Sequence, residues 1–213
     1  NMASIADGEN SPTLAKGTLF SDQETSGGSI TNMFVVTNTG TAVLYLPGAG
    51  IVTLTGDTGD FSVNTSGMVT NIAAGSYTTF KVIFDPATTG TKTGILNIVN
   101  SDSTGGENPY DFKVQGVGIT AEIDLLGTNM VSIVDGENSP TLAKGTLFSD
   151  QETSGGSITN TFVVTNTGSA VLYLPGSGIV TLTGDTGDFS VNTAGMVTNI
   201  AAGSYTTFKV IFD

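Results

Sequence analysis

Short apolar runs that alternate with polar residues recur along the whole chain, and they predict β-strands rather than helices. In residues 78–85, Phe80, Val82 and Phe84 fall on one face of an extended segment, which assigns them to the core. Glycine, threonine, serine and asparagine interrupt every window long enough for a helix. The remaining runs with strand character lie at 29–37, 41–46, 51–55, 93–100 and 110–117.

Turn-forming residues separate these runs. Asn38-Thr-Gly40, Asp85-Pro86 and Asn108-Pro109 interrupt the apolar pattern, and Gly56–Asp60 is expected to be a solvated hairpin loop. Short strands at this spacing predict a sandwich of roughly seven to nine strands. The expected fold class is therefore all-β.

The chain contains an internal repeat. Residues 1–85 and 129–213, here the first and second copies, align without a gap over 85 residues and differ at six positions. The offset of 128 residues is too long for a solenoid repeat and matches an independently folding domain. The six differing pairs are Ala3/Val131, Ala6/Val134, Met33/Thr161, Thr41/Ser169, Ala49/Ser177 and Ser66/Ala194.

The repeat predicts two tandem domains. We place the first at 1–120, without a counterpart of Ala121–Thr128 before it, and the second at 121–213, without a counterpart of Pro86–Thr128. Glu122–Leu126 alternates and is expected to be the first strand of the second domain. A connection that enters a strand so soon leaves little slack between the domains.

Composition excludes several classes of function. The chain has no His, Cys or Trp, and its six basic residues are all Lys. It therefore lacks the usual general base, the thiol nucleophile and the common zinc and iron ligands. A net charge of -13 disfavours nucleic acid and anionic membranes, and no apolar run is long enough for a membrane helix. We expect no enzymatic activity, no nucleic-acid partner and no membrane insertion.

Five segments together resemble a known family. They occur in the order Gly17–Phe20, Phe34–Ala42, Phe80–Pro86, Gly94–Asp102 and Asn108–Gly118. In this order they resemble the immunoglobulin-like repeats called choice-of-anchor D domains, which are similar to ASPM–SPD-2–Hydin modules. The resemblance implies tandem immunoglobulin-like β-sandwich domains in a large secreted or cell-surface bacterial adhesin. It brings no catalytic residues.

Calcium is the one cofactor that the residues suggest. Asp-Gly-Glu-Asn recurs near the start of each copy, and Gly-Asp-Thr-Gly-Asp recurs later in each. Such carboxylates can bind a hard cation, but no EF-hand pattern is present, and Asp-Gly is common in turns. We favour the turn. The candidate ligands are Asp7, Glu9, Asp57, Asp60, Asp135, Glu137, Asp185 and Asp188.

Three other features have ordinary interpretations. Lys81 and Lys113 alternate with core residues, so each is expected to point outward and not to form a crosslink in the core. Asn64-Thr-Ser66 fits a glycosylation acceptor, but the second copy has Asn192-Thr-Ala194, so we attribute the match to chance. Exposed sheet edges could recruit a strand from another chain.

The expected function is a structural stalk or spacer at the bacterial cell surface. Its partners would be neighbouring repeats of the same chain, with host or surface glycans or proteins bound by domains outside this sequence. Two alternatives stay open. Each copy could itself bind a glycan or protein and gain affinity by repetition, or the chain could be a filament subunit that assembles by β-strand addition.

Overall fold

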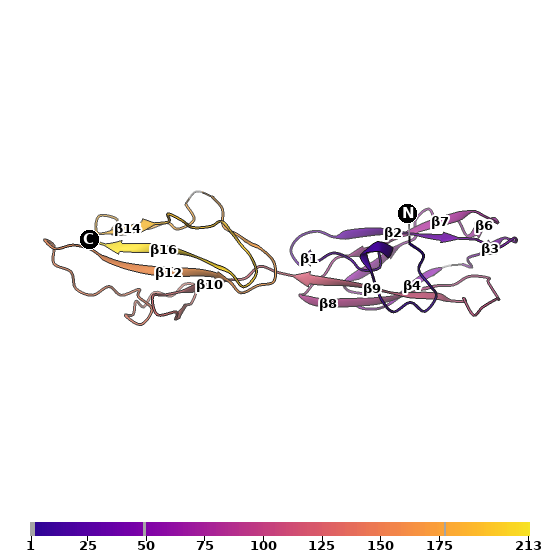
Figure 1. Ribbon diagram of the computed structural model, residues 1–213, viewed down its shortest axis with the longest axis horizontal. Coiled ribbons are helices and arrows are strands. Elements are labelled where there is room, and N and C mark those ends of the chain that lie inside the picture. The colour runs from indigo at the N-terminus through magenta and orange to yellow at the C-terminus, as the bar shows by residue number, and fades with distance from the viewer. Residues whose placement is uncertain (1–2, 49, 177) are drawn as a thin grey trace. The chain divides into compact units, whose positions relative to one another are not determined.

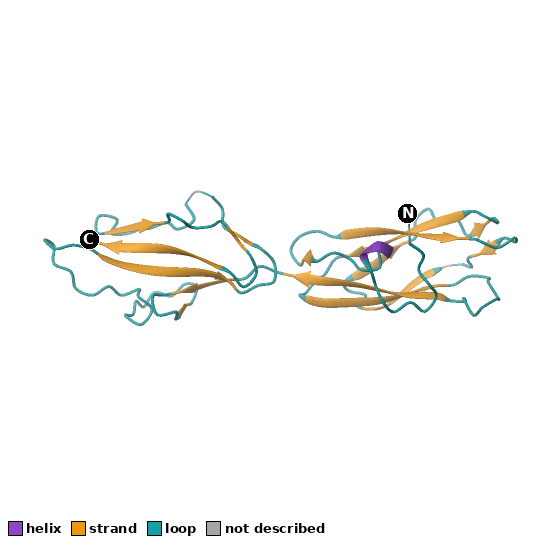
Figure 2. Ribbon diagram, viewed as in Figure 1, coloured by secondary structure: helices purple, strands orange, loops and turns teal. Residues whose placement is uncertain are grey.

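The computed structural model describes residues 3–48, 50–176 and 178–213. It confirms the all-β prediction, since the one helix found in these ranges is a single short turn, η1 (Leu14–Lys16) (Figure 2). The chain divides into two compact units, Asn1–Ile119 (unit 1) and Thr120–Asp213 (unit 2) (Figure 1).

Unit 1 contains nine strands within the described residues. Their bounds are β1 (Gln23–Glu24), β2 (Ile30–Thr37), β3 (Leu44–Tyr45), β4 (Val52–Gly56), β5 (Phe61–Asn64), β6 (Asn71–Ile72), β7 (Tyr77–Phe84), β8 (Gly90–Ile98) and β9 (Tyr110–Ile119).

The strands of unit 1 form two main sheets with a core between them, an arrangement consistent with a β-sandwich. One sheet has the order β1-β9-β8-β4 and the other β2-β7-β5, while β3 and β6 form a small third sheet. The core takes side chains from both main sheets. Its most deeply buried aromatic residues are Phe20, Phe34, Phe61, Phe80, Phe84 and Phe112.

The inward face predicted for residues 78–85 is confirmed. Phe80, Val82 and Phe84 are buried on β7. Phe80 lies opposite Phe34 of β2, with the ring centroids 5.4 Å apart, so the pair fastens the two strands across the sheet.

Two local expectations were wrong. The strand expected at 41–46 is limited to Leu44–Tyr45. Gly56–Asp60 is not a hairpin loop, because β4 pairs with β8 whereas β5 pairs with β7. The chain therefore crosses from one sheet to the other at this loop.

Unit 2 contains seven strands within the described residues. Their bounds are β10 (Ile123–Leu126), β11 (Ser132–Ile133), β12 (Ile158–Asn166), β13 (Leu172–Tyr173), β14 (Phe189–Asn192), β15 (Asn199–Ile200) and β16 (Tyr205–Phe212).

Unit 2 builds one main sheet, β11-β10-β12-β16-β14, and a small sheet of β13 and β15. The strand predicted at Glu122–Leu126 is present as β10 and pairs with β12. Phe162, Val164, Ile200 and Phe208 form its buried core, and Leu125 of β10 packs against them.

Candidate functional site

The outer edge of β2 is open in unit 1. The three-stranded sheet runs β2-β7-β5, so β2 has one paired side and one unpaired side along Ile30–Thr37. Unpaired backbone groups along a strand edge are a template for another strand. This edge is therefore the first place to look for a binding function.

A groove of about 890 Å³ follows that edge, and we call it the edge groove. It is lined by the N-terminal segment Ala3–Ile5 and by residues of β2 with the turn that follows it. Helix η1 and Gly17 also line it. Apolar core side chains also line it: Phe34, Val36, Leu44, Phe80, Ile98 and Phe112.

Backbone amides beyond the end of β2 lack acceptors. Among the described residues, the N–H groups of Thr39, Thr41 and Ala42 have no hydrogen-bond partner in the protein. Asn38, by contrast, is buried, and its Nδ2 donates to the carbonyls of Ala42 (2.7 Å) and Ile72 (2.8 Å). The Asn-Thr-Gly turn is therefore rigidly placed and leaves free donors beside the edge groove.

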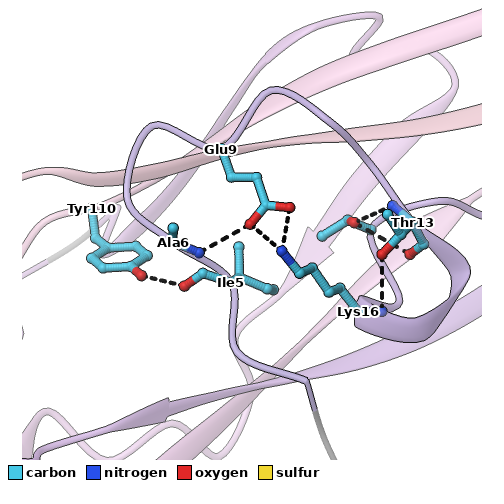
Figure 3. A network of polar contacts seen from close by, with 7 residues as sticks. Ile5, Ala6, Glu9, Thr13, Lys16 and Tyr110 are labelled. Carbon is cyan, nitrogen blue, oxygen red and sulfur yellow. Dashed lines mark hydrogen bonds and ion pairs between the residues drawn. The ribbon is translucent and has the colours of Figure 1, made fainter.

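The first calcium candidates form structural contacts instead (Figure 3). The carboxylate of Glu9 accepts two hydrogen bonds from Lys16 Nζ, both 2.6 Å, and one from the amide of Ala6 at 3.0 Å. Asp7 Oδ1 accepts the amide of Asp111 at 2.8 Å. These contacts fasten the segment before η1 to β9 and close the Asp-Gly turn that we favoured.

Tyr110 holds the same segment from the other side. Its hydroxyl donates to the carbonyl of Ile5, and Ile5 lines the edge groove (Figure 3). Burial raises the pKa of Tyr110, and the negative charges of Glu107, Asp7 and Glu9 add to the effect. The hydroxyl therefore remains a donor at neutral pH.

The second pair of calcium candidates in unit 1 also bonds to backbone. Asp57 Oδ2 accepts the amide of Thr93 at 2.6 Å, and Asp60 Oδ1 accepts the amide of Ala87 at 2.8 Å. Lys92 Nζ lies 3.7 Å from Asp60 Oδ2. The pair therefore ties the crossover between β4 and β5 to β8 and to the turn before it.

The corresponding acids of unit 2 keep part of this pattern. Glu137 pairs with Lys144, as Glu9 does with Lys16. The remaining acids of unit 2 lack the amide partners that their counterparts have in unit 1, because unit 2 contains no segment that corresponds to residues 86–119. These acids are Asp135, Asp185 and Asp188. No cluster of three metal-binding side chains occurs in the part of the chain that the structure describes. Calcium binding stays a prediction.

Acidification is expected to release Glu9 from Lys16. Hydrogen bonds from Lys16 and Ala6 hold the pKa of Glu9 below its ordinary value, and Lys144 does the same for the pKa of Glu137. Because these folded-state pKa values are depressed, the stabilisation is present above the unfolded-state pKa of about 4.3. It is lost as the pH falls through the folded-state pKa.

An NMR titration of the glutamate carboxyls checks this. Lys16→Met is expected to return the pKa of Glu9 towards its ordinary value and to leave the pKa of Glu137 unchanged. The effect on stability should be small, since both pairs are partly exposed to solvent. An unchanged pKa of Glu9 in the variant would contradict the assignment.

The structure also shows the surroundings of the asparagine in the glycosylation-like motif and of the two lysines considered for a crosslink. Asn64 Oδ1 accepts the amide of Ser66, and Asn192 Oδ1 accepts the amide of Ala194, both at 2.9 Å. The asparagine therefore caps a turn in both units, whichever residue stands two positions later. Lys81 is exposed, as expected, while Lys113 is half-buried and alternates with buried Phe112 and Val114.

Sequence reasoning missed two surface features. The edge groove depends on which strands lie side by side, and periodicity does not report that. Four tyrosines are also exposed by half or more of their surface. They form two pairs, and the members of each pair occupy equivalent positions in the two copies. They are Tyr45, Tyr77, Tyr173 and Tyr205. Exposed aromatic residues are a recurrent means of binding sugars and proteins.

Three solved structures show distant likenesses to this chain. No protein-family model and no curated protein matches the sequence. A protein of unknown function from Porphyromonas gingivalis W83 aligns with a TM-score of 0.34 and 15% identity, over 92% of this chain and 79% of that one. Secreted serine protease VesC from Vibrio cholerae aligns with a TM-score of 0.38 and 12% identity, over 91% and 44% of the two chains.

The class 5 fimbriae chaperone CfaA aligns with a TM-score of 0.30 and 10% identity, over 86% of this chain and 80% of the chaperone. Similarities this weak transfer no function. Separately, none of the helices in the described ranges has the length and apolar character needed to span a membrane.

Proposed function

We propose that the chain is a pair of immunoglobulin-like β-sandwich repeats that act as a non-catalytic stalk in a long, surface-displayed bacterial adhesin. The observation that carries the proposal is the repeat itself. Two copies differ at six of 85 positions, and each lies in its own compact unit. A spacer needs only length and stiffness, so it tolerates identical modules in a way that a catalytic pair of domains does not.

The unit boundary supports this function. Ile119, the last residue of β9, accepts a hydrogen bond from the amide of Thr25. The next residue, Thr120, accepts the amides of Ser169 and Ala170. The residues on both sides of the unit boundary therefore make backbone hydrogen bonds within their own units. A stalk requires a boundary without a flexible linker.

The acidic residues serve the same function. Within the described residues of unit 1, the carboxylates of Asp7 and Asp57 hold loops to β9 and β8. Those of Glu9 and Asp60 bond to Lys16 of η1 and to the turn before β8. The net charge of -13 keeps neighbouring chains apart and soluble. Neither property needs a catalytic centre.

Immunogold labelling of intact, unpermeabilised cells that produce the protein tests the proposal. An antibody raised against the chain is expected to place gold particles in rows that extend outward from the envelope. A second antibody against a cytoplasmic protein controls for leakage. Labelling that occurs only after permeabilisation would overturn the proposal and would place the units inside the cell as interaction modules.

The exposed tyrosines favour one alternative, a repeated binding module. Tyr77 and Tyr205 are each 66% exposed at equivalent positions. If the units bind glycans by stacking on these rings, a glycan array should show binding that the Tyr77→Ser, Tyr205→Ser double variant loses. Absence of binding to the array by the unmodified chain would leave the stalk function alone.

A further inference from the structure

We propose that the edge groove of unit 1 binds an extended strand with the sequence of Thr120–Leu126, supplied by an adjoining repeat of the same polypeptide. The strand would lie antiparallel to β2, in the place that β10 occupies in unit 2. The two units provide a matched comparison, because their sequences are nearly identical here and only unit 2 holds the strand.

The register of the strand follows from unit 2. There Leu125 lies opposite Val164 and Ile123 opposite Asn166, and the corresponding residues of unit 1 are Val36 and Asn38. Both line the edge groove. Val164 is 5% exposed beneath β10, whereas Val36 remains only partly buried.

The free backbone donors of unit 1 match bonds made in unit 2. Thr167 donates its amide to the carbonyl of Glu122 at 2.8 Å, and Ser169 and Ala170 donate theirs to the carbonyl of Thr120 at 2.7 and 2.8 Å. The counterparts of these three donors are Thr39, Thr41 and Ala42. Ala170 is buried by the contact, whereas Ala42 is exposed.

The buried asparagine shows the same difference. Asn166 Oδ1 accepts the amides of Gly168 at 3.0 Å and Glu122 at 3.3 Å. Asn38 Oδ1 accepts the amide of Gly40 at 3.0 Å and has no second donor among the described residues. A docked strand would supply the second bond.

A glycine gives the strand room to pass. A Cβ at Gly168 would lie 2.3 Å from the carbonyl oxygen of Thr120 and 2.5 Å from the amide nitrogen of Glu122. At Gly40 the nearest atom to such a Cβ is Asn38 Oδ1, at 3.3 Å. Gly40 therefore has a space above it that the strand fills in unit 2.

The lining of the edge groove also fits the residues that follow the strand. In unit 2 the amide of Thr128 donates to the carbonyl of Lys144, and a Cβ on Gly127 would collide with that carbonyl. The counterpart of Lys144 is Lys16, which lines the edge groove. The lining of the groove thus includes counterparts of residues that contact 120–128 in unit 2 near both ends of that segment.

Connectivity identifies the source of the strand. In unit 2, β10 turns through Gly127 into β11, and the two strands pair at Leu125–Ile133 and Leu126–Ser132. In unit 1 the counterparts of β11, Ser4 and Ile5, line the edge groove without forming a strand. A segment that runs into Asn1 would reach the groove by the same tight turn, so it needs no second chain.

The proposal that an adjoining repeat supplies the strand rests on the proposed function. The proposal that the edge groove binds such a strand does not. The test therefore uses the full chain with residues 120–128 duplicated immediately before Asn1, so that the carbonyl of Thr120 is included. A matched control carries the same extension with the counterpart of Leu125 replaced by serine, because Leu125 packs against the buried core of unit 2, whereas Ile123 is 54% exposed. Hydrogen exchange by NMR reads the amides of Thr39, Thr41 and Ala42.

The extension is expected to slow exchange at these three amides by about tenfold or more, and the serine control should not slow it. Gly40→Ala is expected to cancel the slowing in the extended chain. In the unextended chain it is expected to lower the unfolding midpoint only slightly, because its Cβ would lie 3.3 Å from Asn38 Oδ1. Equal exchange with both extensions, or slowing that survives Gly40→Ala, would overturn the proposal.

A second copy is the competing source. If the unextended chain shows slowed exchange at these amides that increases with protein concentration, together with dimers or fibres, the strand comes from another molecule. That result would refute the source proposed here and favour assembly by strand addition. Failure of the surface labelling, by contrast, would refute the stalk and leave strand binding intact.

Discussion

Replacing Phe84 by alanine is expected to cost unit 1 about 3–5 kcal/mol of unfolding free energy, one of the largest losses that a single substitution can cause in this chain. Phe84 is fully buried, with its ring centroid 4.7 Å from that of Phe61 and 5.8 Å from that of Phe20. A Cβ on Gly116 of the facing sheet would come within 2.5 Å of the ring. The ring therefore fills the space between the sheets, and its removal leaves a closed cavity.

Phe212→Ala is the matched control, since Phe212 is the same residue in the second copy. It keeps the equivalent aromatic contacts, at 4.8 Å from Phe189 and 5.9 Å from Phe148. However, the described part of unit 2 has no strand facing it, and the side chain is partly exposed. The expected loss is about 1–2 kcal/mol, because solvent fills the space that the ring leaves.

Urea denaturation followed by NMR measures both losses in one chain. The amide signals beside Met33 and Thr161 distinguish the units, because these positions differ between the copies. Phe84→Ala should shift the midpoint of unit 1 alone, and Phe212→Ala that of unit 2 alone. Equal losses in the two units would show that the sheet facing Phe84 does not enclose it.

The alternation of apolar residues predicted β7 and its buried face correctly, but pairing decides other strands. Val52–Gly56 and Val180–Gly184 have the same sequence, yet only the first forms a strand, β4. β4 pairs with β8, and unit 2 has no counterpart of β8. A five-residue run acquires strand structure from its neighbour, and periodicity alone does not report the neighbour.

The reverse case occurs at the start of the units. Ser132–Ile133 is a strand because β10 lies beside it, whereas Ser4–Ile5 is irregular. This pair of residues and β2 both line the edge groove. The candidate site could not be predicted from residue types, since it consists of ordinary core residues and backbone groups that one copy covers and the other exposes.

The acidic motifs illustrate a different limit. Asp7, Glu9, Asp57 and Asp60 stood out as a repeated pattern of carboxylates, which is chemistry that cations and backbone amides share. The structure assigns them to amides and to Lys16 and Lys92. Spacing in the sequence identified the residues that matter locally, and only the fold shows what each of them contacts.

Replacing Asn166 by alanine is expected to destabilise unit 2 by about 3–5 kcal/mol. The side chain is completely buried, and its Nδ2 donates to the carbonyls of Ala170 at 2.7 Å and Ile200 at 2.8 Å. Its Oδ1 accepts the amides of Gly168 and Glu122. Alanine would leave these groups without partners, and each buried group left unpaired costs about 1–3 kcal/mol.

Asn38→Ala in unit 1 isolates the contribution of β10. Asn38 makes the same bonds to two carbonyls and to Gly40, and it lacks only the bond that Asn166 accepts from Glu122. The loss in unit 1 should therefore be smaller than the loss in unit 2 by about the worth of one hydrogen bond, 0.5–1.5 kcal/mol. Denaturation of each variant, read at the signals of its own unit, gives the difference. Equal losses would mean that the asparagine holds the turn and not the strand, and that β10 is retained by the packing of Leu125 alone. In that case an extension docked on unit 1 should depend on the side chain that corresponds to Leu125.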